Sequence, residues 1–237
     1  MTADIAVVDY GMGNLRSVAK ALEHVAPQST IVVTGDPAVI AQAGRVVFPG
    51  QGAMRDCMRE MDAKGLRSAV LAAAREKPFL GICIGLQMLF EHSEEGDTPG
   101  LAFLKGIVRR FPVEEMVDAQ DRKLKVPHMG WNEVHQSVQH PLWSGIPDGT
   151  RFYFVHSYFA EPAHADLIAG YALYPFMFTC AAAVANVFAV QFHPEKSHEA
   201  GLQLLRNFAA WEPDAFVGAA GAVEPLQRRR VIGHAVV

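Results

Sequence analysis

The chain lacks the sequence features of secreted, membrane-spanning and nucleic-acid-binding proteins. Three cysteines among 237 residues are too few for a disulfide framework and fit a reducing cytosol. No apolar run approaches membrane-spanning length, and the N-terminus lacks the basic start and apolar core of a signal peptide. A net charge of -4 gives no support for binding nucleic acid or an anionic membrane. We therefore expect a cytoplasmic protein with neither nucleic-acid nor membrane partners.

Metal-binding and nucleotide-binding patterns are missing too. The histidines His128, His135, His140 and His156 have no metal-ligand spacing, and no Cys-X-X-Cys pair occurs. The glycine-rich stretch Tyr10–Asn14 lacks the third glycine and the Lys-Ser/Thr of phosphate-binding loops. We expect no metal ion and no cofactor.

What is present is an alternation of strands and helices. Half of the residues are apolar, which is ample for one sizeable domain. Short β-branched runs alternate with helical patterns in the first half, as in a parallel α/β sheet. Strands are expected at 5–8, 31–33, 46–48 and 78–82, and helices from 15, from 54 and over 66–74. The second half is richer in strands, at 104–111, 151–159, 167–173 and 184–192, and ends in a helix over 199–210. The sequence thus predicts an α/β fold with an open, mostly parallel sheet flanked by helices and an added antiparallel strand region. One domain covers 1–211, and 212–237 is expected to be a peripheral or disordered extension.

Cys83 differs from the other two cysteines in its setting. It follows an apolar strand inside the pattern Gly81-Ile82-Cys83-Ile84-Gly85, the thiol version of a nucleophile elbow. Small flanking residues allow a strained turn, and the dipole of the helix that follows favours the thiolate. Cys57 and Cys180 are interpreted as buried packing residues. Cys83 is therefore the expected nucleophile.

A base and two sources of backbone N–H groups accompany this thiol. His193 and Glu195 lie two residues apart on a stretch expected to be extended, so both face one side, and the carboxylate can orient the imidazole. Pro49-Gly50-Gln51-Gly52 ends a neighbouring strand, where glycines let backbone N–H groups approach an oxyanion beside the N–H of Ile84. The pattern predicts covalent catalysis by a cysteine.

With these residues, the chain resembles the class I (triad-type) glutamine amidotransferases, which have a flavodoxin-like fold. Within that family it is most similar to the glutaminase subunits of imidazole glycerol phosphate synthase, from histidine biosynthesis. The resemblance runs from about Ile5 to Trp211. Beyond the elbow and the His193/Glu195 pair, it is carried by the stretches Asp9–Leu15, Val126–Asn132 and Phe152–Tyr158.

The resemblance implies that L-glutamine is hydrolysed to glutamate through a thioester on Cys83, with His193 as base and Glu195 orienting it. It implies an oxyanion site at the N–H groups of Gln51 or Gly52 and of Ile84. A (β/α)8-barrel cyclase subunit is implied as the partner that receives the ammonia, in a heterodimer. Remaining roles are assigned by matching positions: Gln87, Glu95, Ser157 and Tyr158 for binding glutamine, and Asn14, Trp131 and Lys196 for the interface with the cyclase.

Alternatives remain open at this point. A cysteine hydrolase or peptidase on a related fold would use an acyl pocket unrelated to glutamine. A non-catalytic subunit would have no need to keep Cys83, His193 and Glu195 together. Another amidotransferase glutaminase, serving aminodeoxychorismate or pyridoxal phosphate synthesis, would copurify with a different synthase.

Two departures from the family pattern are visible. Tyr174-Pro175 stands where the family has Tyr-Gly, and proline there restricts a turn that is expected to lie away from the catalytic residues. The segment 212–237 has no counterpart in the pattern, so its role is open.

Overall fold

The computed structural model describes residues 3–118 and 120–213, and within them the strands form one mixed sheet. The first half contains β1 (Ile5–Val8), α1 (Leu15–Val25), β2 (Ile31–Thr34), α2 (Pro37–Gln42), β3 (Arg45–Gly50), α3 (Met54–Ala63), α4 (Arg67–Glu76), β4 (Phe79–Cys83) and α5 (Ile84–Met88). The second half adds the strands β5 (His92–Ser93), β6 (Thr98–Pro99), β7 (Gly106–Arg110), β8 (His128–Gln136), β9 (Thr150–His156), β10 (Tyr158–Pro162), β11 (Ile168–Leu173), β12 (Met177–Val184) and β13 (Val187–Val190). It also holds α6 (His198–Ala210) and the 3₁₀ turns η1 (Val113–Glu115), η2 (Pro141–Trp143), η3 (Ala165–Leu167) and η4 (Pro194–Lys196).

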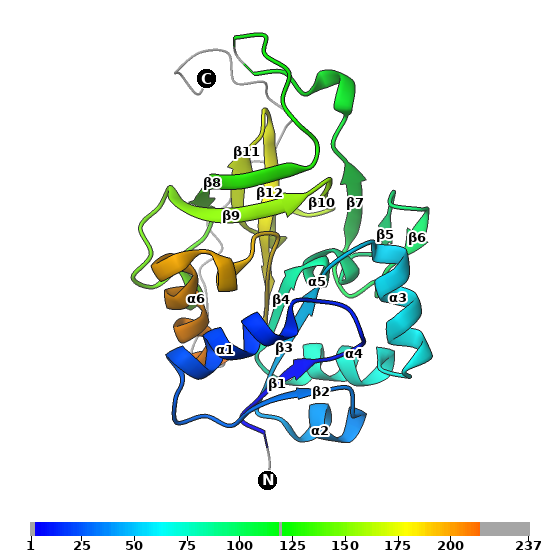
Figure 1. The fold of residues 1–237 in the computed structure, drawn as a ribbon, viewed down its shortest axis with the longest axis vertical. Coiled ribbons are helices and arrows are strands. Elements are labelled where there is room, and N and C mark those ends of the chain that lie inside the picture. Colours follow the sequence, from blue (N-terminus) through cyan, green and yellow to red (C-terminus); the bar gives the residue numbers. More distant parts are fainter. Residues whose placement is uncertain (1–2, 119, 214–237) are drawn as a thin grey trace.

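The parallel part of the sheet has the order β2-β1-β3-β4-β13 (Figure 1). Every residue of β1, β4 and β13 is buried, because helices cover both faces, and this is why these strands are continuous apolar runs. α1 packs beside α6, and α2 packs beside α4. The expected open, mostly parallel sheet flanked by helices is confirmed.

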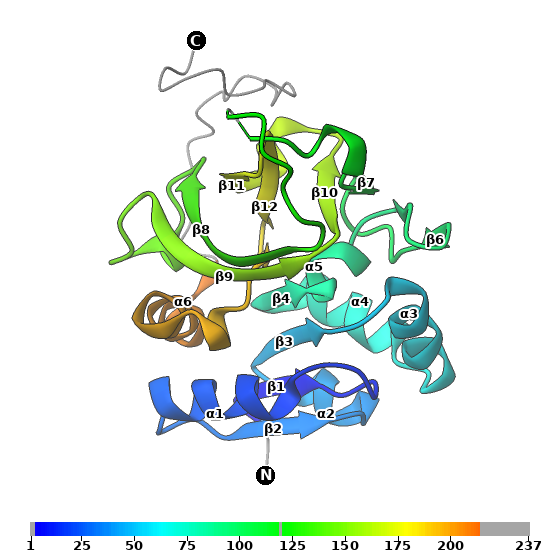
Figure 2. The ribbon, with the colours of Figure 1, turned by 45° about the horizontal axis from the view of Figure 1, so that its top comes forward.

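The antiparallel region begins at β12, which pairs with β13, and continues through β10 and β7. β11 lies beside β12, and β8 with β9 extends from β11 and curves across the molecule (Figure 2). The parallel and antiparallel parts therefore meet at β13, which pairs parallel with β4 and antiparallel with β12. β4 leads to Cys83 and β13 leads to His193.

The structure corrects several expected boundaries. The single strand expected at 184–192 is the second half of a hairpin that turns at Ala185, whose φ is +49°, and Asn186. The strand expected at 151–159 is two strands that separate at Ser157. The short helix α2, capped by a hydrogen bond from the Ala38 amide to the Asp36 carboxylate, was not expected, and neither was β8. Six residues are too few to show a helical period. In β8 the exposed face carries Met129 and Trp131 while the more buried face begins with His128, so no apolar alternation marks this strand.

The boundary expected at residue 211 falls at the end of α6. The guanidinium of Arg45 donates hydrogen bonds to the Trp211 carbonyl and to the Glu212 carboxylate, so the first residue of the expected extension still contacts β3. The expectation of a peripheral or disordered extension falls, from residue 214 onward, outside the described residues.

Candidate active site

Cys83 stands at the carboxyl end of β4, between β3 and β13. It has φ +56° and ψ -109°, a backbone conformation that residues other than glycine rarely adopt. Such a conformation costs about 1–3 kcal/mol and persists only where the surrounding structure holds it. The strand register puts Gly50 of β3 beside Cys83. The expected strained elbow is therefore present, with the loop after Gly50 next to the sulfur.

The two glycines that flank Cys83 are required by close packing. A Cβ at Gly85 would overlap the carbonyl oxygen of Phe48 on β3, and one at Gly81 would come within 2.9 Å of the Ala189 side chain on β13. The first turn of α5 thus lies directly on β3. Because Ile84 begins α5, its amide has no partner within the helix and is free to donate to a ligand.

His193 and Glu195 contact each other as expected, but not through an extended stretch. Residues Pro194–Lys196 form the 3₁₀ turn η4, so the expectation of two alternate positions on a strand was wrong. The turn brings Nδ1 of His193 within 2.9 Å of Oε1 of Glu195, and both side chains are almost fully buried. Ser197 fixes this turn, since its hydroxyl donates to the His193 carbonyl and accepts from the amide of Tyr153 on β9.

The charge state of His193 depends on its neighbours. Burial alone would lower the pKa of His193, but the charge of the nearby Cys83 together with the charge and hydrogen bond of Glu195 outweighs burial and raises the pKa to about 10. With Nδ1 held by Glu195, Nε2 is left as a buried nitrogen without a hydrogen-bond partner. The imidazole can therefore hold a proton taken from the thiol, with Nε2 as the atom that exchanges it.

A pair of glutamine side chains connects Cys83 to the opposite wall. Nε2 of Gln191 donates to Sγ of Cys83 over 3.7 Å, and Oε1 of Gln191 accepts from Nε2 of Gln87 at 2.9 Å. Nε2 of Gln87 also donates to the carbonyl of Tyr158 at 3.2 Å, whereas its Oε1 is buried without a partner. The amide nitrogen of Gln87 is thus committed to the protein, and its oxygen is available to a ligand.

One cavity of about 320 Å³ joins most of the expected residues. It is lined by Gln51, Gly52, Cys83, Ile84, Gln87, Glu95, Pro127, Val155, His156, Ser157, Tyr158, His193 and Lys196. Glu195 lies behind His193 and does not line the cavity. The structure therefore brings the expected nucleophile, base, oxyanion donors and glutamine-binding positions to one cavity.

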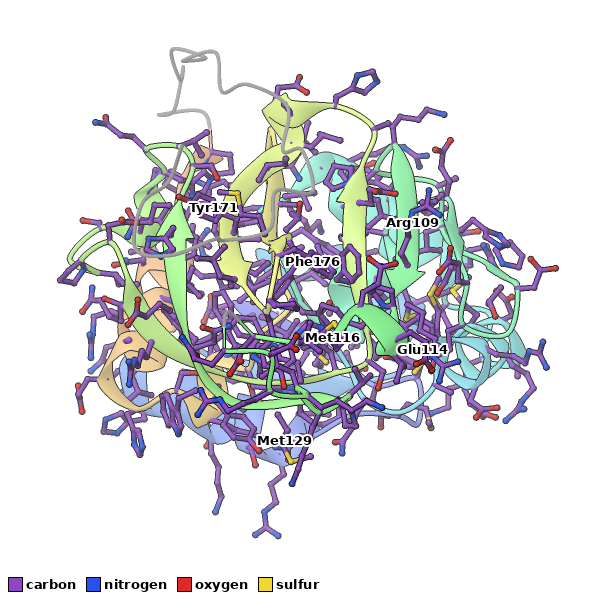
Figure 3. The ribbon with its side chains drawn as sticks, turned by 90° about the horizontal axis from the view of Figure 1, so that it is seen from above. Arg109, Glu114, Met116, Met129, Tyr171 and Phe176 are labelled. Atoms are coloured by element: carbon purple, nitrogen blue, oxygen red, sulfur yellow. The ribbon has the colours of Figure 1, made fainter. Side chains whose placement is uncertain are left out.

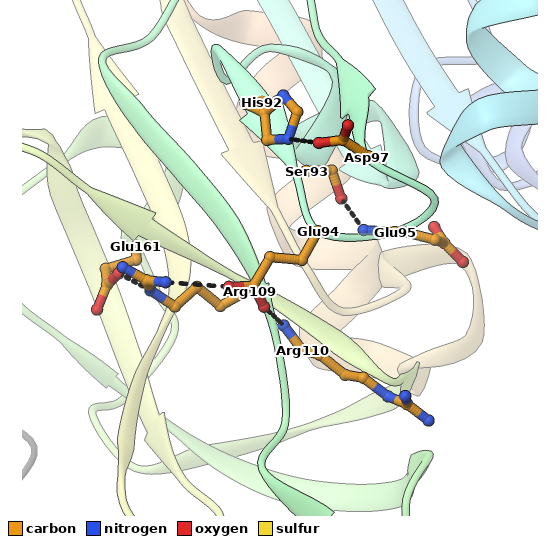
Figure 4. A network of polar contacts seen from close by, with 8 residues as sticks. All are labelled: His92, Ser93, Glu94, Glu95, Asp97, Arg109, Arg110 and Glu161. Carbon is orange, nitrogen blue, oxygen red and sulfur yellow. Dashed lines mark hydrogen bonds and ion pairs between the residues drawn. The ribbon is translucent and has the colours of Figure 1, made fainter.

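Glu95 enters this cavity from a tightly bonded loop between β5 and β6. Burial raises the pKa of the Glu95 carboxyl, and a hydrogen bond from the Met54 amide at 2.8 Å partly offsets this. Figure 4 shows the neighbouring bonds: the Glu95 amide donates to the Ser93 hydroxyl, and Glu94 accepts from Arg109 and from the amide of Arg110. The loop is thereby fixed to β7, and Glu95 keeps its carboxylate at the cavity.

Two buried histidines underlie the opposite wall. Nδ1 of His156 lies 2.8 Å from the carbonyl of Tyr158, which only accepts, so this nitrogen carries the proton. His156 Nε2 then accepts from Nδ1 of His128 at 2.9 Å, and Nε2 of His128 accepts from the Asn132 amide. Burial lowers the pKa of His128 to about 4; burial, His128 and His193 lower that of His156 to about 3. Both rings are therefore neutral and hold the Tyr158 carbonyl in place. The ring of Tyr174 stacks on His128 at 4.0 Å, so the Tyr174-Pro175 departure adjoins this layer.

The expected interface residues occupy different places. Lys196 lines the cavity and lies over the ring of Tyr153, while Trp131 is 44 % exposed and stacks on His198. Asn14 precedes α1 and makes no capping hydrogen bond with its side chain. Met129, on the same strand as Trp131, is 62 % exposed, and Figure 3 shows it at the surface while Phe176 points inward.

Gln191, His128 and His156 were not expected at the site. The signal for Gln191 is its position at the end of a buried strand, two residues before the expected base His193. The two histidines gave no signal of their own because they lack metal-ligand spacing, although both lie in stretches that carry the family resemblance.

In the described part of the chain no group of three or more His, Cys, Asp or Glu side chains is arranged to hold a metal ion. Among the same residues, no helix has the length and apolar character needed to cross a bilayer.

Comparison with known proteins agrees with this geometry. Residues 6–211 match the family model of glutamine amidotransferase class-I. The imidazole glycerol phosphate synthase subunit HisH of Thiobacillus denitrificans is 69 % identical over 92 % of this chain and 96 % of its own length. The subunit HisH of Aromatoleum aromaticum is 66 % identical over 89 % of this chain and all of its own length.

Among solved structures, a glutamine amidotransferase matches 88 % of this chain and 100 % of its own with a TM-score of 0.64 at 15 % identity. The glutaminase domain of Trypanosoma brucei CTPS with bound acivicin matches 94 % of this chain and 99 % of its own with a TM-score of 0.59 at 16 % identity. These two likenesses concern the fold. The chain belongs to the class I glutamine amidotransferase family, in which its relatives at 66–69 % identity are HisH subunits of imidazole glycerol phosphate synthase.

Proposed function

We propose that this chain is the glutaminase subunit of a cytoplasmic imidazole glycerol phosphate synthase. It hydrolyses L-glutamine and passes the ammonia to a (β/α)8-barrel cyclase subunit, which makes imidazole glycerol phosphate and aminoimidazole carboxamide ribotide. The observation that carries the proposal is the placement of Cys83 beside an imidazole whose Nδ1 is bound by a buried carboxylate. The names and high identity of the relatives support the placement in this synthase.

In the first half-reaction, Sγ of Cys83 attacks the side-chain amide carbon of glutamine. The thiol proton passes to Nε2 of His193, and the carbonyl oxygen becomes an oxyanion facing the N–H groups of Ile84 and of Gly52 or Gln51. His193 then gives its proton to the amide nitrogen, the C–N bond breaks, and ammonia leaves a glutamyl thioester on the enzyme. Glu195 orients the ring and stabilises its positive charge in this step.

In the second half-reaction, water replaces ammonia. His193 takes a proton from the water as its oxygen attacks the thioester carbon, and the same N–H groups bind the second oxyanion. The C–S bond breaks, glutamate is released, and the proton returns to the sulfur. Gln191 donates to Sγ and stabilises it whenever it carries negative charge.

The rest of the cavity fits the amino-acid end of the substrate. The Glu95 carboxylate binds the α-ammonium group, and N–H and hydroxyl donors at Ser157 and Tyr158 bind the α-carboxylate. Gln87 contributes its unpartnered oxygen as an acceptor, because its nitrogen is already bonded to Tyr158 and Gln191. Trp131, Lys196 and Asn14 are the residues proposed for the surface that receives the cyclase.

The test is glutamate release from L-glutamine by the full chain, with and without a barrel-type cyclase subunit and its nucleotide ligand. Strong stimulation by the cyclase supports both the chemistry and the partner. Hydrolysis that ignores the cyclase would assign the chain to another amidotransferase, and no glutamate in either case would reject the glutaminase.

Cys83→Ala separates the two activities of the complex. We expect this variant to release no measurable glutamate, because only this thiol forms the thioester, while cyclase activity supplied with ammonium salt continues. Loss of both activities would contradict the division of roles proposed here.

A further inference from the structure

A chain of hydrogen bonds runs beside the cavity from β8 to the carbonyl of Tyr158, and backbone groups fix its direction. The side-chain oxygen of Asn132 accepts from the amide of Glu133 at 2.8 Å, so the nitrogen of Asn132 faces His128. That nitrogen also donates to the carbonyl of Leu173 at 2.9 Å, which only accepts. Nε2 of His128 is therefore an acceptor, and the proton of this ring lies on Nδ1.

The proton on His128 determines where His156 carries its own. The two residues are paired across β8 and β9, and Nδ1 of His128 lies 2.9 Å from Nε2 of His156. Burial lowers the pKa values of both rings, so both are neutral and each has a single proton to donate. Because Nε2 of His156 accepts, the proton of His156 lies on Nδ1 and is donated to the Tyr158 carbonyl at 2.8 Å.

The Tyr158 carbonyl in turn decides which atom Gln87 presents to the cavity. This carbonyl can only accept, so the atom of Gln87 that lies 3.2 Å from it has to be the nitrogen. The same nitrogen donates to Oε1 of Gln191, which leaves Nε2 of Gln191 to face the sulfur of Cys83. A ligand therefore meets the unpartnered oxygen of Gln87. Without a fixed Tyr158 carbonyl, both amides could turn over together, and the ligand would meet an N–H group.

We propose that His128 and His156 are positioning residues for the substrate: by holding the Tyr158 carbonyl, they keep the Gln87 oxygen turned toward a ligand that carries a positively charged amino group. This inference rests on the proposed function, in which that ligand is L-glutamine. Gln87 and the Glu95 carboxylate line the same cavity, and two acceptors suit an ammonium group, which only donates. His128 does not line the cavity, so it acts only through His156.

Kinetics of the full chain in complex with the cyclase subunit test this inference. Wild-type glutamate release tests the proposed function, and the ratios between variants test the histidine pair. His156→Leu removes the donor to Tyr158 and should raise KM for glutamine about tenfold, the effect of losing one hydrogen bond, with a smaller change in kcat. His156→Asn, whose side-chain nitrogen can take the place of Nδ1, should restore most of that loss. His128→Leu changes no residue of the cavity lining and should raise KM in the same direction, because Nε2 of His156 loses its donor.

His140→Leu is the matched control. It removes another buried histidine, one whose pKa burial lowers to about 4 and whose ring accepts from the Leu142 amide away from the cavity. This variant should lower the Tm and leave KM at the wild-type value. A rise in KM as large as that of His156→Leu would overturn the inference, as would a KM for His156→Asn no better than that for His156→Leu.

Two further measurements identify the groups involved. L-glutamate and glutarate differ only in the amino group, so His156→Leu should weaken competitive inhibition by L-glutamate and leave inhibition by glutarate unchanged. NMR of the ring nitrogens in the full chain, labelled at histidine, should find His128 and His156 both protonated at Nδ1. Equal weakening of the two inhibitors, or a proton on Nε2 of either ring, would overturn the assignment.

Discussion

At the residue scale, the contacts around His193 determine which of its atoms can act. Glu195 is almost fully buried and holds Nδ1, so the ring cannot turn without breaking a buried ionic hydrogen bond. Nε2 is then the only ring nitrogen that faces the reacting atoms. The carboxylate acts through the imidazole and has no direct contact with the cavity.

This arrangement predicts unequal costs for the two partners. Glu195→Gln keeps an oxygen that can accept from Nδ1 but removes the charge that stabilises the imidazolium, so kcat should fall about ten- to a hundredfold. His193→Ala removes the group that transfers the proton, and kcat should fall about 10³-fold or more. Glutamate release by each variant in the complex measures both effects, and losses of equal size would show that Glu195 does more than orient the ring.

At the scale of elements, the junction of β3, β4 and α5 determines the geometry of the elbow. The first turn of α5 lies so close to β3 that only hydrogen fits at position 85. The strained backbone of Cys83 is held between these elements and does not relax. A change in their spacing would move the sulfur and the Ile84 amide together.

Gly85→Ala tests this junction. The added Cβ overlaps the Phe48 carbonyl, and backbone cannot move aside as a side chain would, so the free energy of unfolding should fall by about 3 kcal/mol or more. Gly65→Ala is the control: a Cβ there meets nothing within 4 Å, and its φ of +66° should cost about 1 kcal/mol. Urea denaturation measures both variants, and equal losses would contradict the steric explanation.

Individual elements show what the sequence could and could not predict. β1, β3 and β4 were predictable because burial on both faces makes them continuous apolar runs between turns. The hairpin β12–β13 was not resolved from the sequence, because its alanines at 181–183 give no contrast at the turn. Cys83 was visible through its glycines, whereas the contact of Cys57 with Gln51 depends on how α3 packs, which no local pattern records.

At the scale of the whole molecule, three buried neutral histidines link stability to pH. Burial lowers the pKa values of His128 and His140 from 6.5 to about 4, and burial with neighbouring histidines lowers that of His156 to about 3. Between pH 6.5 and these lowered pKa values, the three histidines bind protons in the unfolded chain but not in the folded chain. Their contribution to the free energy of unfolding is therefore complete above pH 6.5 and is lost as the pH falls.

Thermal melting at pH 7, 6 and 5 should therefore show a falling Tm. Each buried histidine contributes at most about 1.4 kcal/mol per pH unit in this range. His128→Asn should make the dependence on pH shallower, while the same change at the exposed His164 should leave it unchanged. A Tm that stays constant from pH 7 to pH 5 would contradict this account.

The extent of the working domain can be tested by truncation. The family model ends at residue 211, and the last described contacts of the chain are those of Trp211 and Glu212 with Arg45. Removing residues 214–237 should keep these contacts and leave the glutamate release of the complex within about twofold of wild type. A larger loss would assign a function to the C-terminal segment.

The pairing of β4 with β13 has a consequence for the moment at which the protein becomes active. Gln191 lies 108 positions after Cys83, and His193 follows it, so a ribosome completes the elbow long before the groups that activate its sulfur. Until β13 joins the sheet, Cys83 has neither the imidazole of His193 nor the side-chain amide of Gln191 beside it. Nascent chains and prematurely ended products therefore cannot consume the cell's glutamine, and catalysis begins only with the last strand of the fold.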